Sequence, residues 1–491
     1  MSEKTGDLKR FFKHSGIYAV GNLLNRLGAF VLLPVYTNYL SVVEYGALEL
    51  FYIISSVISG FLAMGIAHAT LRYYFEYDDI DEKNSVVSTN LIGSFVISIV
   101  GIMSIYMIAP GLVDALFDDD VSLTGLYLIL AILLFELSSQ VCLAYIRAIE
   151  YSILFVSISL IKLIIQVVVN IYLVMYLEMG VIGVLSGNLI TVFLGWLVLV
   201  VFTIKRCGLD FSLGKFKLIL IYCYPLLLTT IVKLVSNNAD KFVLNELISL
   251  HALGIYALAL KFSMLIEQLI GEPFSRSYGA FRYTIMKKSN ASQIQSNIVR
   301  YLLIISVLIS LITAMFIDEV LRVMSDSEFW PAAEIVPLLM IVSILRIMIY
   351  PAQTGILYAK KTKYFFIFSI YSAIVNLVAS IILIYYIGII GACLSLILTE
   401  SLVLYLTHKR SQELFYVRYD FKPLLYVVIL GILLYLPVLL ISDYDALARL
   451  FVKMLLLMLF VTIIITQRII TDEELGQLRF YFVKIFKPKA V

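Results

Sequence analysis

The chain has 491 residues, of which 62% are hydrophobic and 14% are charged, and its mean hydropathy is +0.98. This composition excludes a soluble globular domain and is typical of a membrane protein with many spans. The formal net charge of +3 indicates little by itself, because the placement of the charges along the chain carries more information.

The N-terminal segment, residues 1–16, carries four cations ahead of the first apolar run, and no small-residue cleavage site follows that run. We therefore expect an uncleaved first span rather than a signal peptide. A bilayer core of about 30 Å requires about 20 apolar residues per helix, and by this length criterion the sequence predicts about fourteen spans. Their centres lie near Ala29, Ile58, Val100, Leu130, Ile165, Phe193, Leu228, Leu260, Ser306, Ile344, Val375, Leu396, Gly431 and Leu459.

The loops between these spans alternate in charge. Most of the 37 Lys and Arg residues lie at the two termini and in every second loop, and we assign only Lys241, Arg322 and Arg449 to the loops on the other side. Positive charge marks the cytoplasmic side of a membrane protein. The sequence therefore predicts a multi-pass protein with both termini in the cytoplasm.

No loop is long enough to fold as a soluble domain, so we expect no nucleotide-binding or transferase module. No group of residues has the spacing of a metal site, a nucleotide site or a catalytic nucleophile. We therefore expect neither an enzyme nor a protein with a metal, a cofactor or a nucleic-acid partner. The four cysteines, Cys142, Cys207, Cys223 and Cys393, are expected to be small apolar packing residues.

An internal repeat with an offset of 208 residues connects two parts of the chain. Residues 40–46 (LSVVEYG) correspond to residues 248–254 (ISLHALG), and Val181-Ile182-Gly183 corresponds to Ile389-Ile390-Gly391. Leu71-Arg72-Tyr73 and Phe281-Arg282-Tyr283 match with a slip of two residues. Six spans separate the copies, so both copies cross the membrane in the same direction, as in a parallel repeat.

The repeat predicts an all-α integral membrane protein with two six-helix lobes related by a pseudo-twofold axis. Residues 1–210 would form the N-lobe with spans 1–6, and residues 211–420 the C-lobe with spans 7–12. Residues 421–491 would form an appended helix pair, spans 13 and 14, with a basic cytoplasmic tail. A central cleft between the lobes is the expected place for a substrate.

Ten charged residues lie inside the predicted spans. A charge at the centre of a span costs roughly 2.5–3.5 kcal/mol. Ten such charges facing lipid would cost far more than the roughly 5–15 kcal/mol by which a domain is stable. Most must face a polar interior, and only Lys453, near the end of the last span, is expected to snorkel to the interface. The ten are Arg26, Glu49, Glu136, Lys162, Lys233, Lys261, Glu267, Arg346, Glu400 and Lys453.

The stretch from Leu33 to Gly46 (LPVYTNYLSVVEYG) resembles the first-hairpin motif of bacterial polysaccharide and O-antigen flippases of the Wzx type, a branch of the MOP exporter superfamily. The resemblance implies a flippase for undecaprenyl-diphosphate-linked oligosaccharides in the bacterial cytoplasmic membrane. It implies alternating access, coupling to a proton or sodium gradient, and contact with membrane lipid and with a polysaccharide polymerase or other assembly proteins.

Such a substrate has an anionic diphosphate and a polar glycan, and the charged and polar positions suit both parts. Guanidinium and ammonium groups bind phosphate oxygens strongly, and carboxylates can take up the coupling ion. The alternative for every residue is an ion pair or hydrogen bond that joins helices within a lobe. The expected substrate-binding residues are Arg26, Lys162, Lys233, Lys261, Arg346, Asn22, Gln166 and Asn170. The expected ion-coupling residues are Glu49, Glu136, Glu267, Glu400 and Asp240.

Four other functions compete with this one. A flippase for lipid II would share the superfamily and the number of spans. A cation-coupled drug exporter of the same superfamily would favour an acidic or aromatic cavity, and the five interior cations argue against it. A membrane polysaccharide polymerase would need a sizeable outer loop with catalytic residues, and the predicted outer loops are short. A scaffold without transport would leave the interior charges unexplained.

Overall fold

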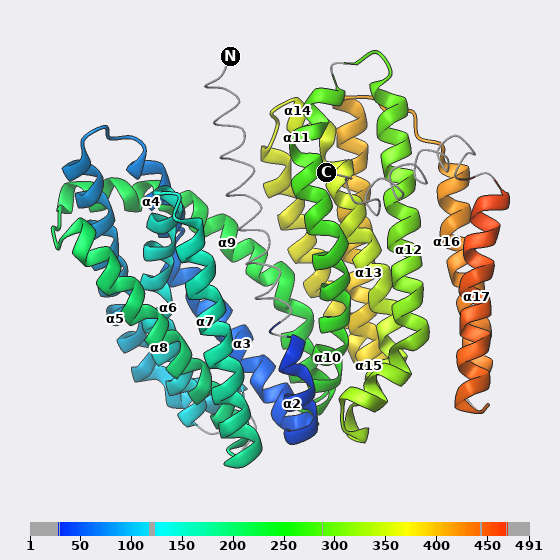
Figure 1. The fold of residues 1–491 in the computed structure, drawn as a ribbon, viewed down its shortest axis with the longest axis horizontal. Helices are drawn as coiled ribbons and strands as arrows, with labels where there is room; N and C mark the ends of the chain where they lie inside the picture. Colours follow the sequence, from blue (N-terminus) through cyan, green and yellow to red (C-terminus); the bar gives the residue numbers. More distant parts are fainter. Residues whose placement is uncertain are drawn as a thin grey trace, which may run out of the picture. The chain divides into compact units, whose positions relative to one another are not determined.

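The fold was analysed in a computed structural model. The structure describes residue 28, residues 30–116, 123–286, 288–441 and 444–467, and residue 469. Every regular element in these ranges is helical (Figure 1). The long apolar runs of the sequence account for this, because a helix satisfies all its backbone hydrogen bonds within one segment, as a lipid environment requires.

The chain forms two compact units. Unit 1 comprises Met1–Ala257, Met324–Phe329 and Asn376–Ala392. Its helices are α2 (Leu33–Tyr39), α3 (Val42–Ala63), α4 (Ile66–Tyr74), α5 (Ile80–Leu116), α6 (Leu123–Ala148), α7 (Ser152–Ile171), the π-helix η1 (Tyr172–Tyr176), α8 (Gly180–Cys207), α9 (Leu213–Leu247) and the short 3-10 helix η3 (Ser327–Phe329). α10 (Leu250–Ile266) and α15 (Lys363–Leu414) contribute residues to both units.

Unit 2 comprises Leu258–Val323, Trp330–Val375 and Cys393–Val491. In addition to its parts of α10 and α15, it contains the π-helix η2 (Glu267–Gly271), α11 (Glu272–Ile285), α12 (Ala291–Met324, up to Val323), α13 (Ala332–Ala352), α14 (Thr354–Tyr358), α16 (Phe421–Tyr435), the 3-10 helix η4 (Leu436–Leu440) and α17 (Ala446–Thr466). α13 contains Pro337 and Pro351 and ends one residue after Pro351, at Ala352.

Twelve helical segments within the described ranges are long and apolar enough to cross a membrane. One of them, α15, has 52 residues and is interrupted by non-helical backbone at Ile387 and Gly388. Gly388 has φ +61°, a conformation that glycine adopts without steric penalty. Most of the first predicted span lies outside the described residues. The multi-pass helical prediction is confirmed, and the number fourteen stays a prediction.

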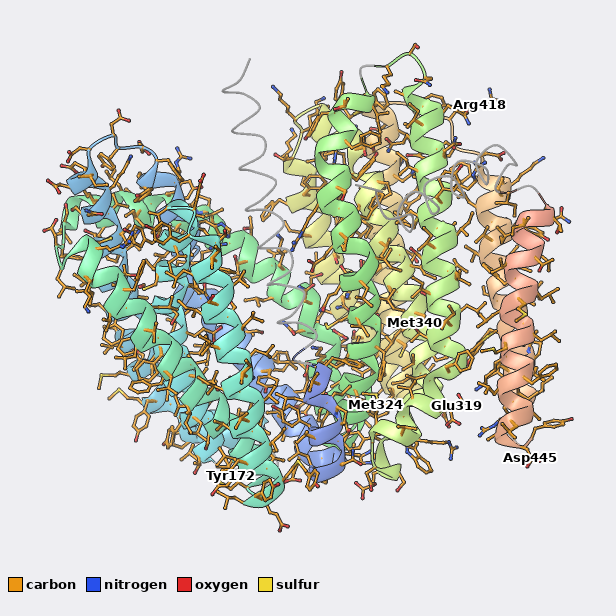
Figure 2. The ribbon with its side chains drawn as sticks, viewed as in Figure 1. Tyr172, Glu319, Met324, Met340, Arg418 and Asp445 are labelled. Atoms are coloured by element: carbon orange, nitrogen blue, oxygen red, sulfur yellow. The ribbon has the colours of Figure 1, made fainter. Side chains whose placement is uncertain are left out.

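The turn between α2 and α3 is fixed by local hydrogen bonds. Ser41 caps α3, because its side chain accepts a hydrogen bond from the backbone N–H of Glu44 and the Glu44 carboxylate accepts one from Ser41 N at 2.9 Å. This reciprocal capping box satisfies two donors of the first helical turn. Thr37 in α2 also donates to the carbonyl of Met324, where α12 ends (Figure 2).

α3 and α10 cross at two glycines, and there the backbones touch. A Cβ atom at Gly46 would lie 2.0 Å from Leu250 O, and a Cβ atom at Gly254 would lie 2.2 Å from Val42 O. Only glycine permits this approach, as at other close crossings of membrane helices. Val42 and Leu250, like the two glycines, differ by the repeat offset of 208 residues. The contact is therefore reciprocal, as a local two-fold axis would make it. The repeat over the whole chain stays a prediction.

The core of unit 1 lies among α4, α5, α6, α8 and α9. α6 packs against both α5 and α8, and α4 packs against α6. Buried apolar residues from each of these helices meet in one cluster, which includes Ile66, Leu91, Val141, Leu199 and Ile219. This packing gives the unit a rigid frame from which the polar side chains of α3, α7 and α8 project.

Candidate functional site

Two of the predicted site residues, Asn22 and Arg26, lie outside the described residues. The structure places the remaining predicted residues in four groups, three of them in unit 1 and one in unit 2, with Lys233 and Lys261 apart. The groups differ in burial and in charge.

Amide and phenol side chains form a connected hydrogen-bond network in unit 1, here called the amide network. Asn188 Oδ1 accepts from Gln166 Nε2 at 2.9 Å and from Asn170 Nδ2 at 3.3 Å, and Asn188 Nδ2 donates to the hydroxyl of Tyr52 at 3.1 Å. Asn170 Nδ2 also donates to the hydroxyl of Tyr36 at 2.6 Å. The network joins α2, α3, α7 and α8, and all its members are uncharged.

Gln166 and Asn170 are predicted substrate-binding residues, whereas Asn188 and Tyr36 are not among the predicted site residues. Asn188 lies in a mainly apolar part of α8 and Tyr36 lies beside Thr37 and Asn38 in α2, so the spacing within one helix does not connect them. The close approach of α7 to α8 depends on Gly187, where a Cβ atom would lie 1.8 Å from Asn170 Oδ1. In the sequence, the Gly187-Asn188 pair in the middle of an apolar run is the feature that indicates a close polar contact between helices.

A fully buried ion pair joins α3 to α9 in unit 1. Lys241 Nζ lies 2.7 Å from Glu49 Oε1, and each side chain is only 9% exposed. The assignment of Lys241 to an outer loop was wrong, because the residue lies inside α9. Beside it in the sequence, Asp240 is 1% exposed and accepts a hydrogen bond of 2.5 Å from the hydroxyl of Tyr256. Glu49 and Asp240, both predicted to couple ions, are thus buried in unit 1.

Glu136 and Lys162 form a second group of opposite charges in unit 1. Glu136 in α6 and Lys162 in α7 attract each other electrostatically, and both side chains are partly exposed. The stem of Lys162 lies against Gly195 of α8, where a Cβ atom would lie 2.6 Å from Lys162 Cδ. The glycine therefore makes room for the lysine stem between the helices.

Unit 2 contains a cluster of two carboxylates and one guanidinium, here called the Arg346 cluster. Arg346 Nε lies 2.8 Å from Glu400 Oε1, and Arg346 Nη1 lies 3.8 Å from Glu267 Oε2. Tyr350 donates to Glu267 Oε1 at 3.2 Å. Glu267 opens the π-helix η2, a type of distortion that is frequent at functional sites. The two carboxylates and the guanidinium together carry a net charge of −1, and their side chains are 15–26% exposed.

The other predicted cations of the site are Lys233 and Lys261. Lys233 in α9 is exposed, and it has no ion-pair partner among the residues that the structure describes. Lys261 in α10 is partly buried. Among the predicted site cations that the structure describes, Lys233 is the exposed one, whereas Arg346 is held between carboxylates.

Lys453 does not snorkel, contrary to prediction. The side chain is buried, and its ammonium group lies 2.6 and 2.8 Å from the two carboxylate oxygens of Glu319, near the end of α12 (Figure 2). A neighbouring pair has the same arrangement, with Arg449 Nη1 3.2 Å from Asp318 Oδ2. These two ion pairs attach α17 to α12, a structural role that removes Lys453 from the candidate site.

Comparisons with known proteins agree with this architecture. Residues 37–278 match the model of a family described as "Polysaccharide biosynthesis protein". No curated relative matches the chain in sequence. A solved structure described as the lipid II flippase MurJ in an inward closed conformation is similar, with a TM-score of 0.71 and 17% identity. The match covers 92% of this chain and 99% of that chain.

Two further solved structures share the fold. An inward-facing MATE multidrug transporter of the MOP superfamily is similar with a TM-score of 0.66 and 13% identity, covering 80% of this chain and 97% of that one. A MOP superfamily transporter from Pyrococcus furiosus, described as having a binding pocket of reverse polarity, is similar with a TM-score of 0.53 and 13% identity. That match covers 82% of this chain and 95% of the other.

The resemblance carried by residues 33–46 agrees with the family match of residues 37–278 and with the fold of these transporters. The chain is a multi-pass membrane protein with the fold of MOP superfamily transporters, and its residues 37–278 match the polysaccharide biosynthesis protein family.

Proposed function

We propose that the chain flips an undecaprenyl-diphosphate-linked oligosaccharide across the bacterial cytoplasmic membrane by alternating access. The observation that carries the proposal is the match of residues 37–278 to a polysaccharide biosynthesis family in a chain with a MOP transporter fold. A glycan cannot cross hydrocarbon unaided, because each buried hydroxyl without a hydrogen bond costs roughly 2–7 kcal/mol. A transporter is therefore needed wherever the lipid-linked sugar is assembled on one side and used on the other.

The amide network supports a glycan as the polar part of the substrate. Asn170, Asn188 and Gln166 offer neutral donors and acceptors beside the hydroxyls of Tyr36 and Tyr52. Such groups match sugar hydroxyls, which both donate and accept. A cationic drug would instead favour carboxylates and aromatic faces.

Binding of the diphosphate requires cations, and the candidate cations differ in whether a carboxylate already holds them. Lys233 is exposed and free to meet a phosphate, and Arg26, Lys162 and Lys261 are the other candidates from the sequence. Arg346 is engaged by Glu267 and Glu400, so its charge is already neutralised. A proton or Na⁺ taken up by either carboxylate would loosen that hold and favour binding of an anion at Arg346. This exchange would couple the ion gradient to the anionic substrate.

The change of access is proposed to involve the crossing of α3 and α10 at Gly46 and Gly254. The backbones touch there without any side chain between them. Glu49 and Asp240, the two carboxylates buried near this crossing, are candidates for a second coupling site. With both termini in the cytoplasm, the substrate would be released on the outer side to a polysaccharide polymerase or another assembly protein.

The proposal is tested by reconstituting the full chain into liposomes with a fluorescent undecaprenyl-diphosphate-linked oligosaccharide. We expect the glycan to appear in the opposite leaflet when a proton or sodium gradient is imposed, and the effective gradient names the coupling ion. Glu400→Gln should abolish the gradient dependence. Glu413→Gln is the matched control, because Glu413 lies on the same helix but pairs with Arg410 outside the cluster.

A second neutralisation experiment addresses the substrate site. Arg26→Gln, Lys233→Gln and Arg346→Gln together should stop glycan transport while the protein still inserts normally. Intact transport by this triple variant would contradict the assignment of the cations. Failure of the wild-type chain to move the glycan, with the protein folded, would contradict the proposed function itself.

Lipid II is the second candidate substrate, favoured by the similarity to a lipid II flippase over 92% of this chain. Both candidates share a lipid diphosphate and differ in the glycan. Competition between the two lipids in the same liposomes separates them, because the preferred substrate should block transport of the other at the lower concentration.

A further inference from the structure

A buried arginine in unit 2 has two guanidinium nitrogens without a hydrogen-bond partner among the described residues. Arg282 lies in the last turn of α11 and is 6% exposed. Within the described part of the chain, its Nε and Nη1 atoms are buried and have no hydrogen-bond partner. An arginine keeps its charge in proteins, and a buried charge without a partner is costly. Nothing in the proposed transport site uses this residue.

The surroundings of Arg282 are apolar and aromatic. Tyr278, Arg282 and Ile285 share one face of α11, and Tyr278 and Ile285 belong to a buried cluster with Ala291, against which Phe415 packs. The guanidinium carbon lies 5.1 Å from the centre of the Tyr278 ring. This cation–π contact stabilises the charge in part but accepts no N–H hydrogen bond in the plane of the guanidinium.

The neighbouring polar groups are engaged elsewhere. The Tyr278 hydroxyl lies 2.6 Å from Gln295 Oε1 and 3.1 Å from Thr354 Oγ1. The acidic residues nearest to Phe415 in the sequence also have partners, since Glu413 pairs with Arg410 and Asp420 caps α16. Burial lowers the pKa of Arg282, and the nearby tyrosines Tyr278 and Tyr283 offset only part of this effect. Among the described residues, Arg282 is therefore a buried cation without an ion-pair partner.

We propose that Arg282 binds the phosphate group of a lipid headgroup. Guanidinium forms short, charge-assisted hydrogen bonds with phosphate oxygens. α11 is a polar helix between the apolar helices α10 and α12, so Arg282 lies near an end of the membrane-spanning segments, where lipid headgroups are found. The phosphate can come from an anionic phospholipid or from a lipid-linked diphosphate, and the second source rests on the proposed function.

The chain offers a matched control in its first half. Arg72 occupies the corresponding position in the Leu71-Arg72-Tyr73 copy of the repeated motif and also stacks on a tyrosine, at 4.8 Å from the centre of the Tyr222 ring. Arg72 is exposed, so water already satisfies its N–H groups. Arg72→Gln therefore removes the same charge and the same type of stacking without touching a buried, unsatisfied cation.

The test uses the full chain in a detergent whose headgroup carries no phosphate, titrated separately with short-chain phosphatidylglycerol, a short-chain prenyl diphosphate and inorganic pyrophosphate. Binding is measured by native mass spectrometry and by the shift in the midpoint of thermal unfolding. Loss of charge-assisted hydrogen bonds in Arg282→Gln should weaken binding roughly 10- to 100-fold. Arg282→Lys should lose part of the affinity, and Arg72→Gln should bind like the wild type.

A stability readout separates a ligand-binding arginine from a structural one. Without added ligand, Arg282→Gln should unfold at the same temperature as the wild type or higher, because it removes an unsatisfied buried charge. A lower midpoint, or failure of Arg282→Gln to fold, would overturn the proposal, since both indicate that the protein itself satisfies the arginine. Equal affinity of wild type and Arg282→Gln would overturn it as well.

The three titrations also identify the source of the phosphate. Binding of phosphatidylglycerol alone indicates a bilayer lipid, binding of prenyl diphosphate alone indicates the transported lipid, and binding of both indicates headgroup phosphate in general. Binding of pyrophosphate alone, or no binding in any arm by folded protein, overturns the lipid site. Normal glycan transport by Arg282→Gln would leave the proposed function intact while excluding this site from the transport route.

Discussion

The Glu49–Lys241 pair of unit 1 and the Arg346 cluster of unit 2 are both intramembrane ion pairs, but they differ in charge and in burial. The pair matches one carboxylate with one ammonium, and both side chains are 9% exposed. The cluster sets two carboxylates against one guanidinium, with 15–26% exposure. The pair has one charge of each sign, whereas the cluster has one carboxylate more than it has cations and is more exposed. We therefore expect the pair to matter for folding and the cluster for transport.

The largest expected effect comes from breaking the buried pair. Glu49→Gln leaves the Lys241 ammonium without its carboxylate partner, and removal of one member of a buried pair costs roughly 3–5 kcal/mol. The measurement is the free energy of unfolding of the purified protein in detergent. The double variant Glu49→Leu with Lys241→Met is the control, because replacing both charges by apolar residues should recover most of the loss. A stability loss below about 1 kcal/mol in Glu49→Gln would contradict the enclosed pair.

The Glu49–Lys241 pair also shows that the sequence alone does not predict the partner of an intramembrane charge. Glu49 was recognised from its place in an apolar run, but Lys241 was assigned to a loop because it lies near the polar end of its span. Lys453 was expected at the interface, yet it is buried against Glu319. Hydropathy is a property of one segment, whereas the partner of a charge depends on how helices from distant parts of the chain pack. A single sequence contains no record of that packing.

The next effect concerns the crossing that holds α3 against α10. In Gly46→Ala, the new methyl group would lie 2.0 Å from Leu250 O, so the two backbones must separate. We expect a loss of roughly 1–3 kcal/mol, typical of overpacking, with a similar loss for Gly254→Ala. Thermal unfolding in detergent measures both. Gly111→Ala in α5 is the control, because no heavy atom lies within 4 Å of its new Cβ. Equal behaviour of all three variants would mean that the helices do not touch there.

The crossing brings together the two stretches that the repeat pairs, residues 40–46 and 248–254, through their glycines. The repeat by itself does not predict that the two stretches touch. Span positions were predictable because apolar length sets them. The irregular parts were not, since the π-helix at Glu267 and the break at Gly388 arise from local packing that apolar composition does not reveal.

A smaller effect on stability is expected in the Arg346 cluster. Arg346→Gln removes a hydrogen bond of 2.8 Å to Glu400, but both side chains are partly exposed, so water compensates and the loss should be roughly 1–2 kcal/mol. Transport should respond more strongly, with loss of gradient-dependent glycan movement in liposomes. If the variant lost as much stability as Glu49→Gln while transporting normally, the functional distinction between the two groups would be wrong.

The smallest expected effect on stability concerns a tyrosine that donates a hydrogen bond to a carboxylate, and each unit contains one such tyrosine. Tyr350 donates to Glu267 at 3.2 Å where the surroundings are partly exposed, and Tyr350→Phe should cost only about 0.6 kcal/mol, the average for a hydrogen bond between membrane helices. Tyr256 donates to the buried Asp240 at 2.5 Å, and Tyr256→Phe should cost roughly 1.5–3 kcal/mol. Unfolding measurements on both variants therefore compare the same chemical change in the two units. The expected order follows from the deeper burial and the shorter hydrogen bond of the unit 1 pair, so a reversed order would contradict the stronger stabilisation of that pair.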